Sequence, residues 1–301
     1  STVTQTNISK DLYEAIPTGR NPWVMAGLVP GVVTGRLDVG GTEGMQQYNL
    51  EAFGSADSQK SFSIDGLKTN WAGGSGGATM QYYGFEMYEE YNMQTASGTA
   101  ESDVSGVYMN MVTKSGGNQV RGSGFYFRRD DAYDKPNYFA VSVPEFKIEQ
   151  YGATVGGPIR QNRLFYFGSW ERRANNRSVQ VNIPVSIRDF VASLGYDTTT
   201  DVPVTTDEHN VFGKVTFLAS QKHTINTTYM YDHRDLTNQQ VGGNSAGDHG
   251  YDDQRRAWFF VGNLTSVLRS NIVNELRLSA SHQALDRVLP AGSTSKPEIR
   301  F

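Results

Sequence analysis

The 301-residue sequence contains no cysteine. This absence excludes a disulfide framework, a zinc site built on thiolates and a cysteine nucleophile. No stretch approaches the roughly 18 consecutive apolar residues that a membrane-spanning helix needs. The opening "STVTQTNISK" lacks the basic start and apolar run of a signal peptide. We therefore expect a cytoplasmic chain, a processed chain or a fragment, while a membrane β-barrel stays open because its strands alternate and form no apolar block.

An excess of positive charge is also missing. The formal net charge is -4 and the sequence pI is about 5.8. Because phosphate contacts need a basic face, we expect no nucleic-acid partner. Motifs of hydrolases and zinc proteases are absent as well. Acidic and histidine side chains do not form a catalytic set: Asp201, Asp207, His209, His223. The sequence therefore predicts no enzyme, no metal site and no cofactor.

Glycine and aromatic residues are plentiful, with 32 Gly, 16 Tyr and 15 Phe. This composition favours β structure with many turns. The first part of the chain predicts a small mixed domain. Asn21 can cap a short helix that has Pro22 at its first position. The stretch "SFSIDGL" predicts a strand that ends in a turn at Asp65 and Gly66, and further strands are expected within 85–95 and 106–114.

After residue 117 the pattern changes to long alternating strands. Seven are expected, at 118–129, 147–157, 163–174, 208–220, 223–235, 256–268 and 272–284. Tight turns are expected around Pro158, at 221–222 and at 269–271. The other connections, at about 130–146, 174–207 and 233–254, are long and polar. Short turns at one end and long loops at the other are typical of an outer-membrane barrel.

The two faces of these strands differ in polarity. Since side chains alternate with a period of two, one face is expected to meet lipid through Phe217, Tyr229, Leu276 and Leu278. The opposite face is expected to point inward: Lys214, Asn226, Glu275, Arg277. A soluble β-sandwich also alternates and remains the competing interpretation. Strand length and loop asymmetry favour the barrel.

Five ordered motifs, in four stretches of the sequence, carry a family resemblance. "VYMNMVTKSGGNQVRGSGFYFRRDDAYD" and "EQYGATVGGPIRQNRLFYFGSWERRA" resemble the plug-to-barrel junction of TonB-dependent outer-membrane receptors, and are most similar to their Oar-like branch. Upstream, "TGRNPWVMAGLVPGVV" and "SFSIDGLKTN" resemble the plug of the same family. The match runs in order from about residue 10 to residue 280. No TonB box is recognisable before residue 10.

The resemblance implies a mixed α+β plug domain at 1–117, followed at 118–301 by antiparallel strands of a transmembrane β-barrel with long extracellular loops. The family's barrel has about 22 strands around a plugged lumen, so seven make an incomplete barrel. It further implies a bacterial outer-membrane receptor that takes up a scarce ligand. Its partners would be outer-membrane lipid, a periplasmic TonB-type energy-transducing protein, and either the remaining barrel strands or another chain.

Three aromatic residues in a glycine-rich plug segment are the candidate ligand-binding residues: Trp71, Tyr82 and Tyr83. The resemblance places such loops on the extracellular side. The alternative is that they pack the loop against the barrel wall. Charged residues at strand ends are expected to form a solvated rim: Arg128, Arg129, Asp130, Asp131, Asp134, Arg172, Arg173, Arg255, Arg256.

Two other functions remain open. A chain with open strand edges could act as a structural or surface assembly protein, because an open edge recruits another strand. A soluble β-rich binding module or hydrolase is the third possibility, which the missing catalytic motifs disfavour. The ligand of a receptor is left open among a metal chelate, a glycan and a peptide.

Overall fold

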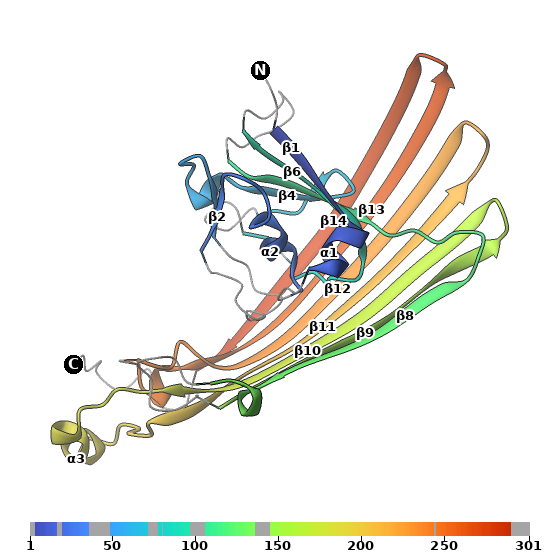
Figure 1. The fold of residues 1–301 in the computed structure, drawn as a ribbon. Helices are drawn as coiled ribbons and strands as arrows, with labels where there is room; N and C mark the ends of the chain where they lie inside the picture. The colour runs from blue at the N-terminus through green and yellow to red at the C-terminus, as the bar shows by residue number, and fades with distance from the viewer. Residues whose placement is uncertain are drawn as a thin grey trace.

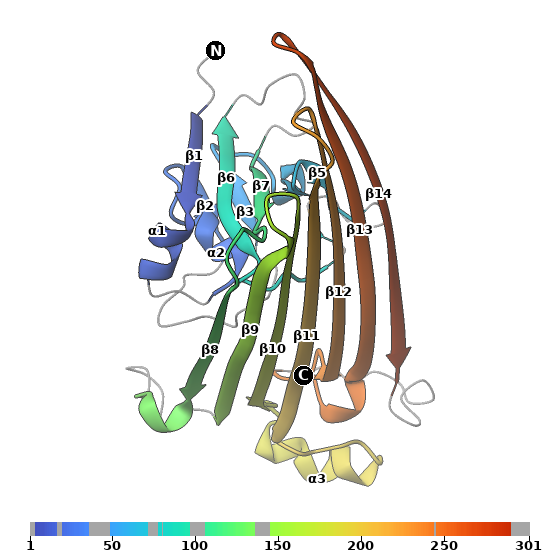
Figure 2. The same ribbon diagram turned by 90° about the vertical axis from the view of Figure 1, so that its right-hand side faces the viewer.

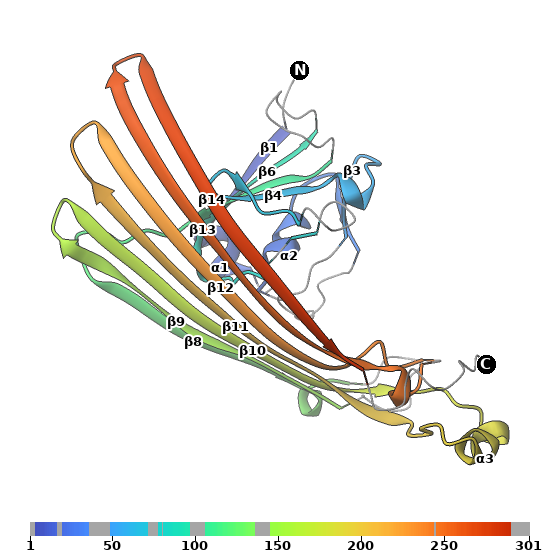
Figure 3. The same ribbon diagram turned by 180° about the vertical axis from the view of Figure 1, so that it is seen from behind.

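The computed structural model describes residues 4–16, 20–35, 49–71, 78–79, 81–96, 106–135, 145–243 and 245–289. Two large sheets dominate them (Figure 1). A curved seven-stranded sheet is formed by the second part of the chain. The elements from Thr4 to Thr113, here called the N-terminal layer, lie against its concave face, as the views from the side and from behind also show (Figures 2 and 3).

The N-terminal layer is built on a five-stranded sheet of order β1-β6-β7-β4-β5, in which only the β4–β7 pair is parallel. Its strands are β1 (Thr4–Ser9), β4 (Ser61–Ile64), β5 (Leu67–Lys68), β6 (Tyr88–Ala96) and β7 (Tyr108–Thr113). The other elements are α1 (Lys10–Ala15), α2 (Pro22–Ala26), the pair β2 (Val32–Thr34) and β3 (Leu50–Ala52), and the 3-10 turn η1 (Asp57–Gln59). The expected helix is confirmed, because the Asn21 side chain accepts from the N–H of Val24 at 2.9 Å.

The core of this layer is aromatic and extends into the seven-stranded sheet. Trp23, Phe62 and Phe85 are fully buried at its centre. Side chains from the large sheet belong to the same buried cluster: Phe167, Phe212, Met230, Phe259, Val261. Burial of each large apolar side chain stabilises the fold by roughly 1.5–3 kcal/mol. The two sheets therefore share one hydrophobic core.

The seven-stranded sheet is antiparallel throughout, and its strands follow chain order from β8 to β14. The strands are β8 (Arg121–Asp130), β9 (Phe146–Arg160), β10 (Leu164–Gln180), β11 (Asp201–Leu218), β12 (His223–Gln239), β13 (Tyr251–Arg269) and β14 (Ile272–Val288). Two 3-10 turns, η2 (Asp131–Tyr133) and η3 (Gly247–His249), and the helix α3 (Val185–Ser193) lie in the connections. The sheet does not close, so the expected open set of seven strands is confirmed. No helix of the described ranges is long and apolar enough to cross a membrane.

Strand length and one turn differ from the expectation. Strands β9 to β14 have 15–19 residues, so they reach well into the stretches expected as long loops. The tight turn expected around Pro158 lies a few residues further on, at 161–163, because Pro158 is inside β9 opposite Phe165. It sits next to a register shift at Leu164, where a missing backbone donor costs little. The turns at 221–222 and 269–271 are confirmed.

The faces of the sheet sort as the alternation predicts. On β11, Lys214 is 7% exposed, whereas Val211 and Val215 on either side of it are each about 40% exposed on the outer surface. Tyr229 on β12 also faces outward, while its neighbour Thr228 is buried. One face of the sheet is therefore apolar and bare. The other carries both polar and apolar side chains and is covered by the N-terminal layer.

A close approach of backbones marks the passage from β7 to β8. A Cβ added to Gly116 would lie 2.1 Å from the carbonyl oxygen of Tyr166 and 2.9 Å from that of Gly157. A Cβ added to Gly117, the next residue, would meet nothing within 4 Å. Gly116 therefore lets the chain pass close to the backbones of β9 and β10 just before β8 begins, where a side chain would not fit.

We predict that Gly116→Ala destabilises the protein by about 1–3 kcal/mol, the usual cost of forcing extra atoms into a packed site. Gly117→Ala is the matched control and should change stability by less than about 0.5 kcal/mol. Urea unfolding in detergent, followed by tryptophan fluorescence, measures both. Equal midpoints for the two variants would contradict the close approach at Gly116.

Candidate ligand site and the face it rests on

The three predicted aromatic residues occupy different environments. Tyr83 is 1% exposed, its ring stacks on Trp23 at 5.9 Å between centroids, and its hydroxyl donates to Oγ1 of Thr69 at 2.7 Å. Burial raises the pKa of Tyr83 far above its ordinary value, so the hydroxyl stays a donor. This position fits the packing alternative. Trp71 is exposed, and its backbone N–H bonds Ala78.

Tyr82 faces the inner wall of the large sheet. The guanidinium carbon of Arg234 lies 3.5 Å from the centroid of the Tyr82 ring, a close cation–π contact. The two residues border a cavity of about 180 Å³. Its other lining residues come from strands β10 to β13: Asn175, Arg177, Val204, Thr206, Leu236, Gln239, Arg255. Tyr82 and Trp71 therefore remain the candidates for ligand contact.

Beneath the cavity lies a buried ionic cluster. Glu208 is fully buried between two arginines, with 3.6 Å to Arg173 and 2.6 Å to Arg234. The expectation that Arg173 and Arg255 belong to a solvated rim is therefore wrong: Arg173 is buried in this cluster and Arg255 lines the cavity. Their sequence neighbours Arg172 and Arg256 point outward, as strand alternation requires. Alternation applied to charged residues would have separated each adjacent pair.

The turn at Asp65 and Gly66 is confirmed, with φ of 48° and 80°, and it also has a role that the sequence did not indicate. Both carboxylate oxygens of Asp65 accept from Thr113, at 3.0 Å from its N–H and 2.6 Å from its hydroxyl. Lys214 of β11 then donates to Oδ2 of Asp65 at 3.3 Å and to Oγ1 of Thr113 at 2.7 Å. A lysine of the large sheet thus binds two segments of the N-terminal layer at once.

A second polar contact fastens the segment that carries Tyr82. The carboxylate of Glu171 on β10 accepts from the backbone N–H of Phe85 at 3.0 Å. Its other oxygen accepts from Gln150 of β9 at 2.6 Å. Glu171 is buried, so these bonds offset part of the cost of removing the group from water. The segment from Tyr82 to Phe85 is therefore bonded directly to the inner face of the seven-stranded sheet.

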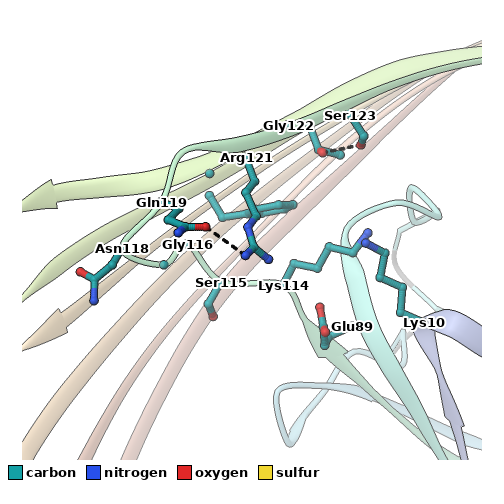
Figure 4. Close-up of a pocket in the computed structure, with 14 residues that line it drawn as sticks. Lys10, Glu89, Lys114, Ser115, Gly116, Asn118, Gln119, Arg121, Gly122 and Ser123 are labelled. Atoms are coloured by element: carbon teal, nitrogen blue, oxygen red, sulfur yellow. Dashed lines mark hydrogen bonds between the residues drawn. The ribbon is translucent and has the colours of Figure 1, made fainter. Parts of the chain in front are cut away.

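A larger cavity of about 710 Å³ lies at the passage into β8 (Figure 4). The side chains of Lys10, Lys114 and Arg121 extend toward it. Burial lowers the pKa of Lys114, and its ion pair with Glu86 at 3.3 Å opposes this shift. The space borders the edge of β8 that has no strand neighbour within the described residues. It therefore adjoins the place that a further strand would occupy, and it is not a candidate ligand site.

The remaining charged residues fit a solvated rim. Arg129 pairs with Asp134 at 2.8 Å near the surface, and Arg172 forms two bonds to Asp207 on the outer face at 2.8 and 2.7 Å. His223 instead bonds Ser266 near the short turns. Among the residues described, no three histidine or acidic side chains are grouped closely enough to hold a metal ion.

Comparison with known proteins gives one family match and a set of similar structures. Residues 112–189 match the model of an outer membrane beta barrel domain. No curated protein matches the chain. The outer membrane transporter YddB from Escherichia coli is similar at a TM-score of 0.68 and 13% identity, over 93% of this chain and 38% of its own.

Two further structures come from Pseudomonas aeruginosa. The siderophore receptor PirA is similar at a TM-score of 0.64 and 11% identity, over 95% of this chain and 41% of its own. A mutant of the ferric enterobactin receptor PfeA, in complex with enterobactin, is similar at a TM-score of 0.61 and 12% identity. The similarity covers 94% of this chain and 41% of the receptor's own. The chain thus spans about two fifths of the length of these structures. It carries strands of an incomplete outer-membrane β-barrel and lies in the bacterial outer membrane.

We predict that Lys214→Met weakens the attachment of the N-terminal layer by about 3 kcal/mol, because the carboxylate of Asp65 loses its cation in a largely buried site. Asp65→Asn combined with Lys214→Met should cost less than the sum of the single variants. Lys222→Met, in the exposed turn before β12, is the control and should change little. Urea titration monitored by tryptophan fluorescence gives the values, and equal midpoints for the two lysine variants would refute the role of Lys214.

Proposed function

We propose that residues 1–117 are the plug and residues 118–301 the first barrel strands of a TonB-dependent outer-membrane receptor of the Oar-like branch. The observation that carries this proposal is the position of the N-terminal layer. It covers the inner face of the seven-stranded sheet through a shared hydrophobic core and the Lys214 contacts, while the outer face is apolar and bare. A layer held inside a membrane barrel wall blocks its lumen.

The proposed cycle needs no covalent chemistry. The ligand binds on the long-loop side, where Tyr82 meets the wall and Trp71 is exposed. A TonB-type protein, drawing on energy from the periplasmic side, then shifts the plug away from the wall. Many of the contacts to be broken are ionic or hydrogen-bonded, so both partners are hydrated when they separate. At identities near 13%, the similar structures support the fold, and the cargo has to be argued from this chain's own residues.

We further propose that the outer edges of β8 and β14 pair with further barrel strands. Lipid cannot satisfy a row of backbone N–H and C=O groups, each of which costs several kcal/mol when left unpaired. We expect strong amide hydrogen-exchange protection along all of β14 in native outer membranes. Fast exchange at every second amide of β14 would mean that its outer edge is free, and the barrel would have to be abandoned.

A second candidate function, assembly through the open edges, is favoured by the exposure of β14 on both faces. In that case β14 would be protected by a second copy of this chain. Native mass spectrometry separates the two proposals. A receptor has the mass of one chain, whereas an assembly has a mass that is a multiple of the mass of the same short chain.

The blocking role is tested by locking the layer to the wall. A Cβ added to Gly84 would lie 3.6 Å from Cβ of Asn210 on β11, within the usual span of a disulfide. Because the chain has no cysteine, Gly84→Cys with Asn210→Cys gives one defined cross-link. In planar bilayers we expect the native protein to be closed and to conduct in urea, whereas the oxidised double variant stays closed until it is reduced.

The matched control cross-link joins Thr205 to Thr237, whose hydroxyls lie 2.7 Å apart between β11 and β12. It should leave opening in urea unchanged, since it does not touch the N-terminal layer. Large conductance without urea would contradict the proposed plug. Opening in urea that is unchanged by a fully formed Gly84–Asn210 cross-link would contradict it as well. Energy coupling is measured separately, as binding of the native protein to the purified periplasmic domain of its host's TonB-type protein.

A further inference from the structure

The cavity beside Tyr82 has an unusual lining. Three of its nine lining residues are arginines, Arg177, Arg234 and Arg255, and none is acidic. Four more supply neutral polar groups: Tyr82, Asn175, Thr206, Gln239. Only Val204 and Leu236 are apolar. A lining with this composition suits a ligand that is negatively charged and rich in oxygen.

The charges around the cavity do not cancel. The inward-facing groups of β10 to β14 at this level include five guanidinium groups, the three of the lining together with Arg173 and Arg287. They face four carboxylates: Glu171, Glu208, Asp232 and Asp253. Glu208 pairs with Arg173 and Arg234, and Asp253 pairs with Arg255 and Arg287. Positive charge is therefore in excess where Tyr82 meets the wall.

Buried polar atoms at the cavity still have bonding capacity. The side chain of Arg234 is only 4% exposed, and its Nη1 makes no hydrogen bond to the described protein atoms. The same holds for Nε of Arg255 and for Oδ1 of the buried Asn175. A buried donor left unpaired costs about 1–3 kcal/mol, more when it is charged. Two guanidinium donors and one amide acceptor thus border a space that can hold their partners.

We propose that this cavity binds an anionic group, a phosphate or a carboxylate, of a hydroxyl-bearing ligand. Arg234 and Arg255 donate to the anion, Arg177 adds positive charge, and Asn175 accepts from a neighbouring hydroxyl. At about 30 Å³ per water molecule, 180 Å³ holds about six waters, so only the charged end of a ligand enters. This inference rests on the proposed function, because it names the class of ligand that the receptor takes.

The test uses native protein purified from outer membranes and three probes: glucose 6-phosphate, glucuronate and glucose. Calorimetry in low salt should show binding of at least one of the two anions and at least tenfold weaker binding of glucose. Glucose 6-phosphate against glucuronate separates a phosphate site from a carboxylate site. Affinity for the anion should fall with added salt, as expected for a charged site.

Arg255→Gln is the diagnostic variant, because Asp253 keeps its ion pair with Arg287 at 2.8 Å. It should weaken binding of the anion about tenfold, the usual effect of one lost charge-assisted hydrogen bond. Arg256→Gln removes the same charge from the outer face of the same strand and should leave the affinity unchanged. Retained strand content by circular dichroism shows that both variants fold.

Three results would overturn the anion site: equal affinity for glucose and the anions, equal loss in Arg255→Gln and Arg256→Gln, or no anion binding by the folded protein. The Gly84–Asn210 cross-link is measured on the same preparation. If the cross-link blocks opening and no anion binds, the anion site fails and the plug stands. If an anion binds through Arg255 but the cross-link has no effect, the plug fails while the site remains.

Discussion

Every strand of the large sheet has to satisfy two environments with a period of two residues. Lipid lies on one side and the N-terminal layer on the other, so neighbouring residues in the chain meet opposite requirements. On β11, Val211 and Val215 face outward, and Lys214 between them reaches Asp65 and Thr113. A register slip of one residue would turn Lys214 into lipid, at a cost of about 2–4 kcal/mol at the bilayer centre. The register of the sheet is therefore set by the lipid on one face and the N-terminal layer on the other, as much as by the turns between the strands.

The same requirement explains why polar and charged contacts accompany the hydrophobic core that the two sheets share. Buried ion pairs such as Lys214–Asp65 add little net stability, because desolvation of the charges offsets their attraction. Removing a single partner of such a pair is nevertheless strongly destabilising, because the other charge is left buried without its counter-charge. Such contacts specify one docked position without making it very tight. This is a suitable property for a layer that, as proposed, has to leave the wall under an applied force and return to the same place.

The sequence predicted those features that depend on neighbours along the chain. The cap at Asn21, the turn at Asp65 and the seven strands follow from local chemistry and period-two alternation. Strand β1 was missed, because within "TQTNIS" only Ile8 is an apolar residue and its pairing with β6 is a tertiary contact. The cavity beside Tyr82 was missed for the same reason. Its lining residues come from four strands and one segment of the N-terminal layer, and only the sheet register brings them together.

The excess length of the strands places this cavity relative to the membrane. Trp170, Val211, Tyr231 and Trp258 lie in register across four strands and form the last apolar row of the outer face. Aromatic rows of this kind mark the boundary between lipid and water. One row further toward the long connections the outward residues become polar: Arg172, His209, His233, Arg256.

Those polar rows still belong to regular strands, since backbone pairing does not require lipid. The cavity is lined from this continuation. Asn175 and Arg177 follow Trp170 by five and seven residues on β10, about 17–23 Å along the strand at 3.3 Å per residue. Tyr82 therefore meets the wall beyond the aromatic row, at a level where the outer face is already in water. A charged group can therefore reach the arginines at this level without crossing hydrocarbon, and the excess positive charge of the cavity lining does not have to be placed in lipid.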